Sequence, residues 1–172
     1  MGIVSPWLSW EHVIGRTVHN LSLPIQFASS EELQMTAPDE KEVRLVLQGW
    51  AKATRTGQQN EILANHLPDV LIYDVLAPMK YESAAAYRDN WEEWQPDTQG
   101  EAQFDLEDLE VTASADVAFA HCFIRCGGEL PGGKKFEDLV RATFCLRKIS
   151  GQWSVAHQHI SKPMNTGGNV PE

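Results

Sequence analysis

The last third of the chain carries the side chains best suited to proton chemistry. His157 and His159 lie two residues apart in an apolar run that begins at Trp153 and ends at Ser161. Strand side chains alternate between faces, so this run is predicted to place both histidines beside Trp153 and Val155. Polar groups are costly to bury without partners, which favours the wall of a wet cavity over a solid core. Imidazoles in such a wall could move protons near neutral pH.

Asp74 and Arg141 are the other chemically active candidates. Asp74 is the last residue of a short predicted strand that begins at Asp69. A carboxylate in a dry pocket could act as a general base. The alternative is a structural carboxylate that pairs with Arg141 or caps the following turn. Arg141 lies mid-strand and needs a carboxylate partner from the protein or from an acidic ligand. A dyad of Asp74 with His157 or His159 would suit a proton relay.

Aromatic and polar residues elsewhere could complete a binding wall. The expected ligand contacts are Trp50, Tyr73, Trp91, Trp94, His121, Arg141, Thr143 and Phe144. Helical spacing makes the tryptophans equally suitable as ordinary core residues. With His157 and His159, His121 could also form a three-imidazole metal site, but separate pocket or structural roles are the alternative. We expect no metal and no cofactor.

Composition narrows the class of protein. The chain has 172 residues, of which 42% are hydrophobic, and its formal net charge is −10. This charge argues against nucleic-acid binding, and no apolar run is long enough for a membrane span. Three cysteines lie in predicted strands, which favours reduced thiols over a disulfide framework. Since the start of the chain lacks a convincing signal peptide, a cytoplasmic protein is expected.

The pattern of apolar residues predicts helices first. Residues 1–37 lack periodicity and are expected to form an arm that packs on the body or on a neighbouring subunit. A helix is predicted from Thr36 to Gly57, and a short second helix is predicted to end before Pro68. A short strand over 69–74 then precedes a third helix, which begins at Ser83 and ends at Pro96.

Strands are predicted to follow these helices. The period changes to two over 104–112, 117–126, 136–148 and 152–162, with a turn at Ser150-Gly151. This order indicates an α+β domain over 38–163, followed by a tail over 164–172. A long twisted sheet that three short helices cover incompletely predicts a cone with an open mouth. Its convex face is expected to carry Ala118, Ala120, Cys122 and Ile124 and to form a homodimer.

The layout resembles the nuclear transport factor 2-like (cystatin-like) superfamily and, within it, the SnoaL-like group that includes ketosteroid isomerase relatives. The segments that carry the resemblance are Trp50-Ala-Lys-Ala, Asp69-Val-Leu-Ile-Tyr-Asp74 with Pro78, the Trp91/Trp94 helix, Ser114-Ala-Asp116-Val-Ala-Phe-Ala, Arg141-Ala-Thr143, Gly151-Gln-Trp153, and His157-x-His159-x-Ser161-x-Pro163. The resemblance implies three helices packed on a curved, mainly antiparallel sheet.

The resemblance also implies roles for single residues. Asp74 falls where similar isomerases place their carboxylate base, while their two hydrogen-bond donors fall at Trp50 and near Thr143. These two side chains make a weaker oxyanion hole than steroid enolisation needs, so that activity is not expected. We expect a protein that binds a small, largely apolar molecule and performs cofactor-free isomerase, cyclase or dehydratase chemistry. The alternatives are a non-catalytic binding or dimerisation module and a metal-dependent enzyme.

Overall fold

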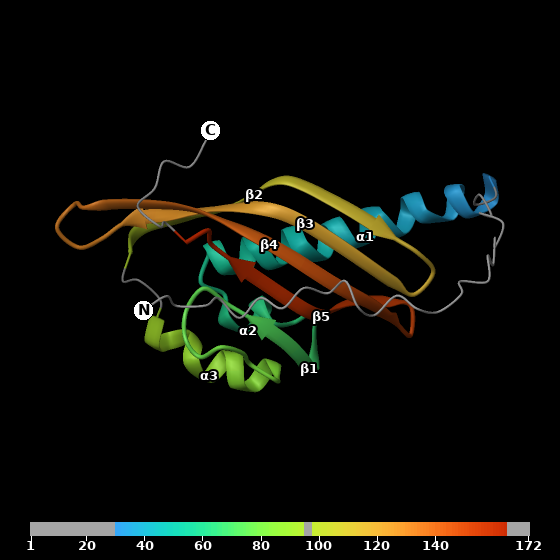
Figure 1. Ribbon diagram of the computed structural model, residues 1–172. Coiled ribbons are helices and arrows are strands. Elements are labelled where there is room, and N and C mark those ends of the chain that lie inside the picture. The colour runs from blue at the N-terminus through green and yellow to red at the C-terminus, as the bar shows by residue number, and fades with distance from the viewer. Residues whose placement is uncertain (1–29, 95–97, 165–172) are drawn as a thin grey trace, which may run out of the picture.

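Three helices and a five-stranded sheet make up the computed structural model, which describes residues 30–94 and 98–164 (Figure 1). Side chains are described over 38–90, at 98 and over 102–164. The elements are α1 (Ser30–Arg55), α2 (Gln59–Ile62), β1 (His66–Tyr73), α3 (Ala84–Trp94), β2 (Gln99–Ala113), β3 (Val117–Glu129), β4 (Lys135–Ile149) and β5 (Gln152–Ser161). The predicted α+β order is confirmed. None of the described helices is long and apolar enough to cross a membrane.

The helix boundaries differ from the predicted ones at two places. α1 begins at Ser30 rather than Thr36 and continues through Pro38. Ser30 is followed by two glutamates, which is itself a helix-start pattern. His66, expected on the second helix, instead opens β1, and Pro68 lies inside that strand. A proline is tolerated there because β1 is an edge strand with one free side.

The strand order in the sheet is β1-β5-β4-β3-β2. β1 runs parallel to β5, and the other neighbours are antiparallel. β4 and β5 are joined by Ser150-Gly151, whose φ angles are 52° and 80°. Two positive φ angles match the two-residue turns that suit the twist of a hairpin. The predicted turn is therefore confirmed.

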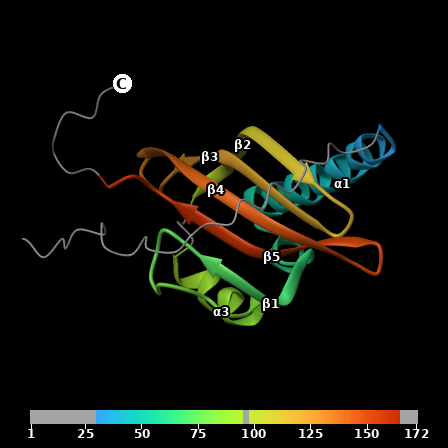
Figure 2. The ribbon, with the colours of Figure 1, turned by 45° about the vertical axis from the view of Figure 1, so that its right-hand side comes forward.

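The prediction of which sheet face is buried is wrong. Ala118, Ala120, Cys122 and Ile124, expected on the free convex face, are buried on the inner face, against which α1 lies. The alternating residues of β3, such as Phe119, point outward. Figures 1 and 2 show α1 along one side of the sheet and no described helix over the other. A period of two shows which residues share a face but not which face the helices cover.

A one-residue bulge in β5 separates the two ends of the run that was expected to share one face. Cys145 of β4 pairs with His157, whereas the next residue of β4 pairs with Val155, so Ala156 is the extra residue. Trp153 and Val155 before the bulge are buried. Beyond it, His157 and His159 lie on the outer face. A bulge re-aims the side chains that follow it, which a simple alternation cannot predict.

The core lies between α1 and the inner face of the sheet. Trp50 of α1 contacts Phe104 and Phe144 edge-on, with ring centroids 5.3 and 5.2 Å away. Val43 and Leu47 of the same helix face are fully buried. These contacts hold the helix against the long strands. These side chains fill the space between α1 and this part of the sheet.

A pair of neighbouring substitutions tests the assignment of the faces. Phe144→Ala is expected to lower the free energy of unfolding by ~3–5 kcal/mol, because it removes a fully buried ring. Thr143→Ala, on the exposed outer face, should change it by less than about 1 kcal/mol. Urea unfolding of both variants measures the difference. Equal losses would mean that the faces are assigned wrongly.

Candidate functional site

A hollow of about 610 Å³ opens at the end of β1. Its walls are Tyr73, Asp74, the loop 75–80 and His159 of β5. β5 lies beside β1, and Tyr73 is in register with His159, which is why these side chains meet. Three of the residues predicted for the site therefore line one hollow. Val75, Leu76 and Met79 give the loop an apolar and exposed surface.

The Asp74 carboxylate is held in place from two sides. The Tyr87 hydroxyl of α3 donates to Oδ2 over 2.8 Å, and the backbone N–H of Val75 donates to Oδ1 over 2.7 Å. Burial raises the pKa of Tyr87 well above its ordinary value, and the nearby Asp74 charge raises it further. The phenol therefore stays protonated at neutral pH and keeps donating. Asp74 is half-buried, so its orientation is set from inside while it still lines the hollow.

A line of buried polar groups continues inward from Tyr87. Gln158 of β5 is only 1% exposed. Its side chain acts to lower the pKa of Tyr87, against the larger effects of burial and of Asp74. Gln158 Oε1 lies 3.2 Å from Nε2 of His66, which is also buried. Within the described part of the chain, Gln158 Nε2, His66 Nδ1 and Trp50 Nε1 are buried without a hydrogen-bond partner. Such groups are rare in proteins, and each one calls for an explanation.

Sequence reasoning missed Tyr87, Gln158 and His66 as members of the site. Tyr87 lies within the predicted third helix and His66 within the predicted second helix, where nothing in the spacing marks them as site residues. Gln158 lies between the two histidines and was expected on the opposite face from them. The available signal was a glutamine in an otherwise apolar position of a strand. Only the bulge in β5 shows that this glutamine lies on the buried face of the strand.

His157 has a local structural partner. Its Nδ1 lies 2.8 Å from the Leu71 carbonyl oxygen, so this nitrogen carries the hydrogen. The Tyr73 ring contacts the imidazoles of His157 and His159 edge-on, at centroid distances of 5.1 and 5.5 Å. His157 is therefore part of a small ring cluster on the outer face. It does not belong to the walls of the hollow at Asp74.

The remaining predicted residues do not reach this hollow. His121, Arg141 and Thr143 are exposed on the outer face, so the pair of Asp74 with Arg141, one of the alternatives for Asp74, does not form. His121 and His159 are both in register with Thr143, on opposite sides of β4, so the three imidazoles do not converge. The described residues contain no group of three or more side chains that could hold a metal.

Two of the aromatic residues predicted for the wall, Trp50 and Phe144, do not line this hollow. Trp50 and Phe144 belong to the packed core. Trp91 and Trp94 lie in α3, but their side chains are outside the described part of the structure.

Comparisons with known proteins place the fold. Residues 43–165 match the family model of the SnoaL-like domain. The chain belongs to this family. It is similar to a nuclear transport factor 2-like protein of unknown function from Pseudomonas putida KT2440, with 30% identity and a TM-score of 0.68. The alignment covers 76% of this chain and 91% of that one. No protein of curated function matches the chain significantly.

More distant structures share the fold of this SnoaL-like chain. A ketosteroid isomerase-like protein from Erwinia carotovora atroseptica has 16% identity and a TM-score of 0.62, covering 74% of this chain and 98% of that one. A nuclear transport factor 2-like protein with a cystatin-like fold from Novosphingobium aromaticivorans has 16% identity and a TM-score of 0.61, covering 76% and 84%. The predicted superfamily and fold are confirmed.

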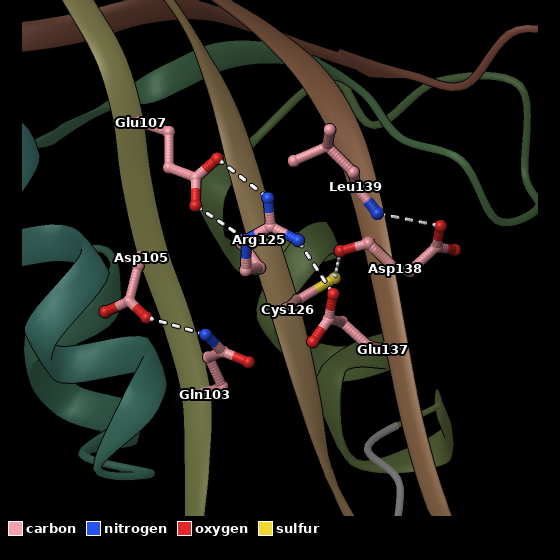
Figure 3. A network of polar contacts seen from close by, with 8 residues as sticks. All are labelled: Gln103, Asp105, Glu107, Arg125, Cys126, Glu137, Asp138 and Leu139. Carbon is pink, nitrogen blue, oxygen red and sulfur yellow. Dashed lines mark hydrogen bonds and ion pairs between the residues drawn. The ribbon is translucent and has the colours of Figure 1, made fainter.

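A second polar network lies on the outer face of the SnoaL-like sheet, away from the hollow. Arg125 of β3 bonds both carboxylate oxygens of Glu107, at 2.6 and 3.1 Å, and Glu137 at 2.7 Å (Figure 3). These three residues come from β3, β2 and β4, so the network ties the long strands together. Every charge in it is paired within the protein. It is structural and offers no free group for chemistry.

The SnoaL-like chain should show a pH-dependent stability that traces to His66. Burial lowers the pKa of His66 from 6.5 to about 4, although its bond to Gln158 acts in the opposite direction. The unfolded chain therefore takes up this proton first, and stability falls as the pH drops from about 6.5 towards about 4. His66→Gln should reduce the loss of unfolding free energy between about pH 7 and about pH 4 by about 3 kcal/mol.

Urea unfolding at both pH values measures this effect. Other groups titrate over the same range, so the wild-type protein and the variant are compared with each other. His121→Gln makes the same change at an exposed imidazole and is the matched control. An identical pH dependence in His66→Gln and wild type would contradict the assignment.

Proposed function

We propose that this SnoaL-like protein binds a small, largely apolar organic molecule in the hollow at the end of β1 and transfers a proton with Asp74 as the base. The observation that carries the proposal is the fixed orientation of the Asp74 carboxylate, which Tyr87 and the Val75 amide hold at the wall of that hollow. A positioned carboxylate beside apolar surface is suited to taking a proton from a carbon acid. This chemistry belongs to the isomerase, cyclase and dehydratase classes and needs no cofactor.

The loop 75–80 supplies the apolar part of the proposed site. Val75, Leu76 and Met79 are 48%, 44% and 91% exposed, so a ligand over Asp74 would cover them. In the proposed step a C–H bond of the ligand breaks, its proton passes to the Asp74 carboxylate, and the electron pair remains on the ligand as an enolate. His159, on the same wall, is placed to return a proton, and Tyr73 is placed to orient the ligand.

Asp74→Asn tests the proposed base. Acetophenone in heavy water is a suitable probe, because it is apolar and exchanges its methyl hydrogens through an enolate. The wild-type protein is expected to accelerate this exchange, and Asp74→Asn should lose ~10²–10⁴-fold of the acceleration. Asp69→Asn, an exposed aspartate of the same strand, is the matched control and should retain it. Proton NMR follows the loss of the methyl signal.

The same experiment distinguishes the proposed enzyme from the second candidate function, a non-catalytic binding module. A non-catalytic binding module would hold the ketone, detected as saturable line broadening, without accelerating exchange in any variant. Equal rates in wild type and Asp74→Asn would contradict the assignment of the base. Saturable binding with no such acceleration would favour the binding module.

We also propose that the outer face of the sheet joins two copies of the chain. Five large apolar side chains are 40–54% exposed on or beside this face, and a free patch of this kind is typical of an interface. They are Val117, Phe119, Phe123, Leu139 and Ile149. Ala118, Ala120, Cys122 and Ile124, which the sequence predicts for this contact, are buried against α1 and so do not form it. All three cysteines are free thiols, which supports a reducing, cytoplasmic location.

Phe119→Glu tests the dimer. A charge in the centre of the patch should shift the protein from dimer to monomer, since an unpaired carboxylate is costly to bury in an apolar interface. Sedimentation velocity at several concentrations measures the shift. Glu61→Lys, at an exposed position of α2 away from this face, is a control that should leave the dimer intact. If deletion of residues 1–29 creates a dimer from a monomeric protein, the N-terminal arm and not a second copy covers this face.

A further inference from the structure

A second hollow, of about 260 Å³, lies between α1 and β2. β2 is the edge strand opposite β1, so this hollow is at the other side of the sheet from Asp74. One stripe of α1 and the adjoining part of β2 form its walls. The residues that line it are Arg44, Gln48, Ala51, Lys52 and Arg55 of α1, and Phe104, Asp105, Leu106 and Leu109 of β2.

The charges in this α1–β2 hollow are unbalanced. Among the described wall residues, three basic side chains meet one carboxylate, Asp105, in a chain whose net charge is −10. Arg55 lies 3.3 Å from Asp105. Within the described residues, Arg44 and Lys52 have no acidic side chain at ion-pair distance. Like charges along one helix face repel each other, so an anion in the hollow would relieve this repulsion.

Two bases elsewhere on the molecule lie beside acidic side chains. Arg125 is paired with two glutamates, and Lys148 lies within 4 Å of both Asp39 and Glu42. Acidic residues outnumber basic ones by 24 to 14, so two bases that share one hollow without an acidic partner among the described residues form a local excess of positive charge in an acidic chain. Two such bases, Arg44 and Lys52, face the same hollow.

A bulge in β2 fixes one of these cations. The register of β2 against β3 shifts between Glu107 and Glu110, and Asp108 has a φ of 51°. The carbonyl of Leu109, outside the regular ladder, accepts a hydrogen bond of 2.6 Å from Nη1 of Arg44. The guanidinium is thereby held at the hollow, with its other N–H groups available. A fixed guanidinium loses little conformational freedom when it binds an oxyanion.

We propose that the α1–β2 hollow binds the oxyanion head, phosphate or carboxylate, of a small amphiphilic molecule. Arg44 offers the planar donor geometry that matches such a head, and Lys52 adds a second positive charge. The half-buried side chains of Phe104, Leu106 and Leu109 form an apolar wall for the body of the ligand. Among the described wall residues, Asp105, bound by Arg55 and by the Gln103 amide, is the one carboxylate that the anion must avoid.

Titration of the full-length protein with three probes tests this site. Phenyl phosphate and benzoate carry the two oxyanion heads on an aromatic body, and benzyl alcohol is the neutral counterpart. The backbone amides of 48–55 and 104–109 should shift saturably with an oxyanion probe, but not with benzyl alcohol. The head that binds more tightly identifies the ligand as a phosphate or a carboxylate.

Variants decide whether the hollow itself binds the probe. Lys52→Gln should weaken binding by at least about tenfold, because it removes one charged contact. Arg44→Gln should weaken it as well, but it also removes the bond to Leu109, so Lys52→Gln is the cleaner variant. Lys41→Gln makes the same change on an exposed part of the same helix and should leave binding unchanged.

Several results would overturn the proposal. These are the absence of saturable shifts, shifts confined to 73–80, or equal weakening by Lys41→Gln, which would indicate only screening of the overall charge. Binding of inorganic phosphate as tight as that of phenyl phosphate would refute the role of the apolar wall. The assay for Asp74 reads a different hollow, so either proposal can fail while the other stands.

Discussion

The extra residue at Ala156 is the constraint on which the arrangement of this site depends. Before it, β5 sends Trp153 and Val155 into the core, and after it the same face receives Gln158 and Ile160. His157 and His159 are turned outward by the same shift. A regular strand would bury the histidines and expose the glutamine. One residue of register therefore decides which polar groups stand behind Asp74 and which stand on the surface.

The polar line behind Asp74 has a cost in stability that its position explains. Tyr87, Gln158 and His66 are buried, and two of these three residues keep a nitrogen without a partner in the described part of the chain. Apolar residues of the same size would form a more stable core. What the line provides is a carboxylate whose direction is set from inside the protein. A base at the wall of an open hollow would otherwise be free to turn towards water.

Charged and apolar side chains form three distinct surfaces on separate parts of the sheet. The edge at β1 carries the carboxylate and the apolar loop, and the edge at β2 carries the cations of the α1–β2 hollow. The open outer face carries large apolar side chains and a network centred on Arg125, in which one guanidinium pairs with two carboxylates. This separation lets one small domain present three different surfaces. Changes at one edge need not disturb the other, because the packed core around Trp50 lies between them.

Much of this fold could be read from the residues alone. The change of period from helical to alternating identified the three helices and the strands after them, and Ser150-Gly151 marked the hairpin. Asp74, Tyr73 and His159 line one hollow, because strand pairing brings the end of β1 beside β5, while their functional roles stay a prediction. These features depend on local geometry and on spacing along the chain.

The tertiary structure decided which face of the sheet is buried and what each polar residue contacts. Alternation is symmetrical, so it cannot tell Ala120 from Phe119 as the inner residue until α1 is placed against one side. The bulge at Ala156 leaves no distinct local mark, and it reversed the expected places of the histidines and Gln158. Arg141 and Thr143, predicted for a pocket, are exposed on the outer face, because alternation along β4 does not tell which of its two faces α1 covers. The local sequence determines where helices and strands form. The packing of α1 on the sheet determines the surface on which each side chain lies.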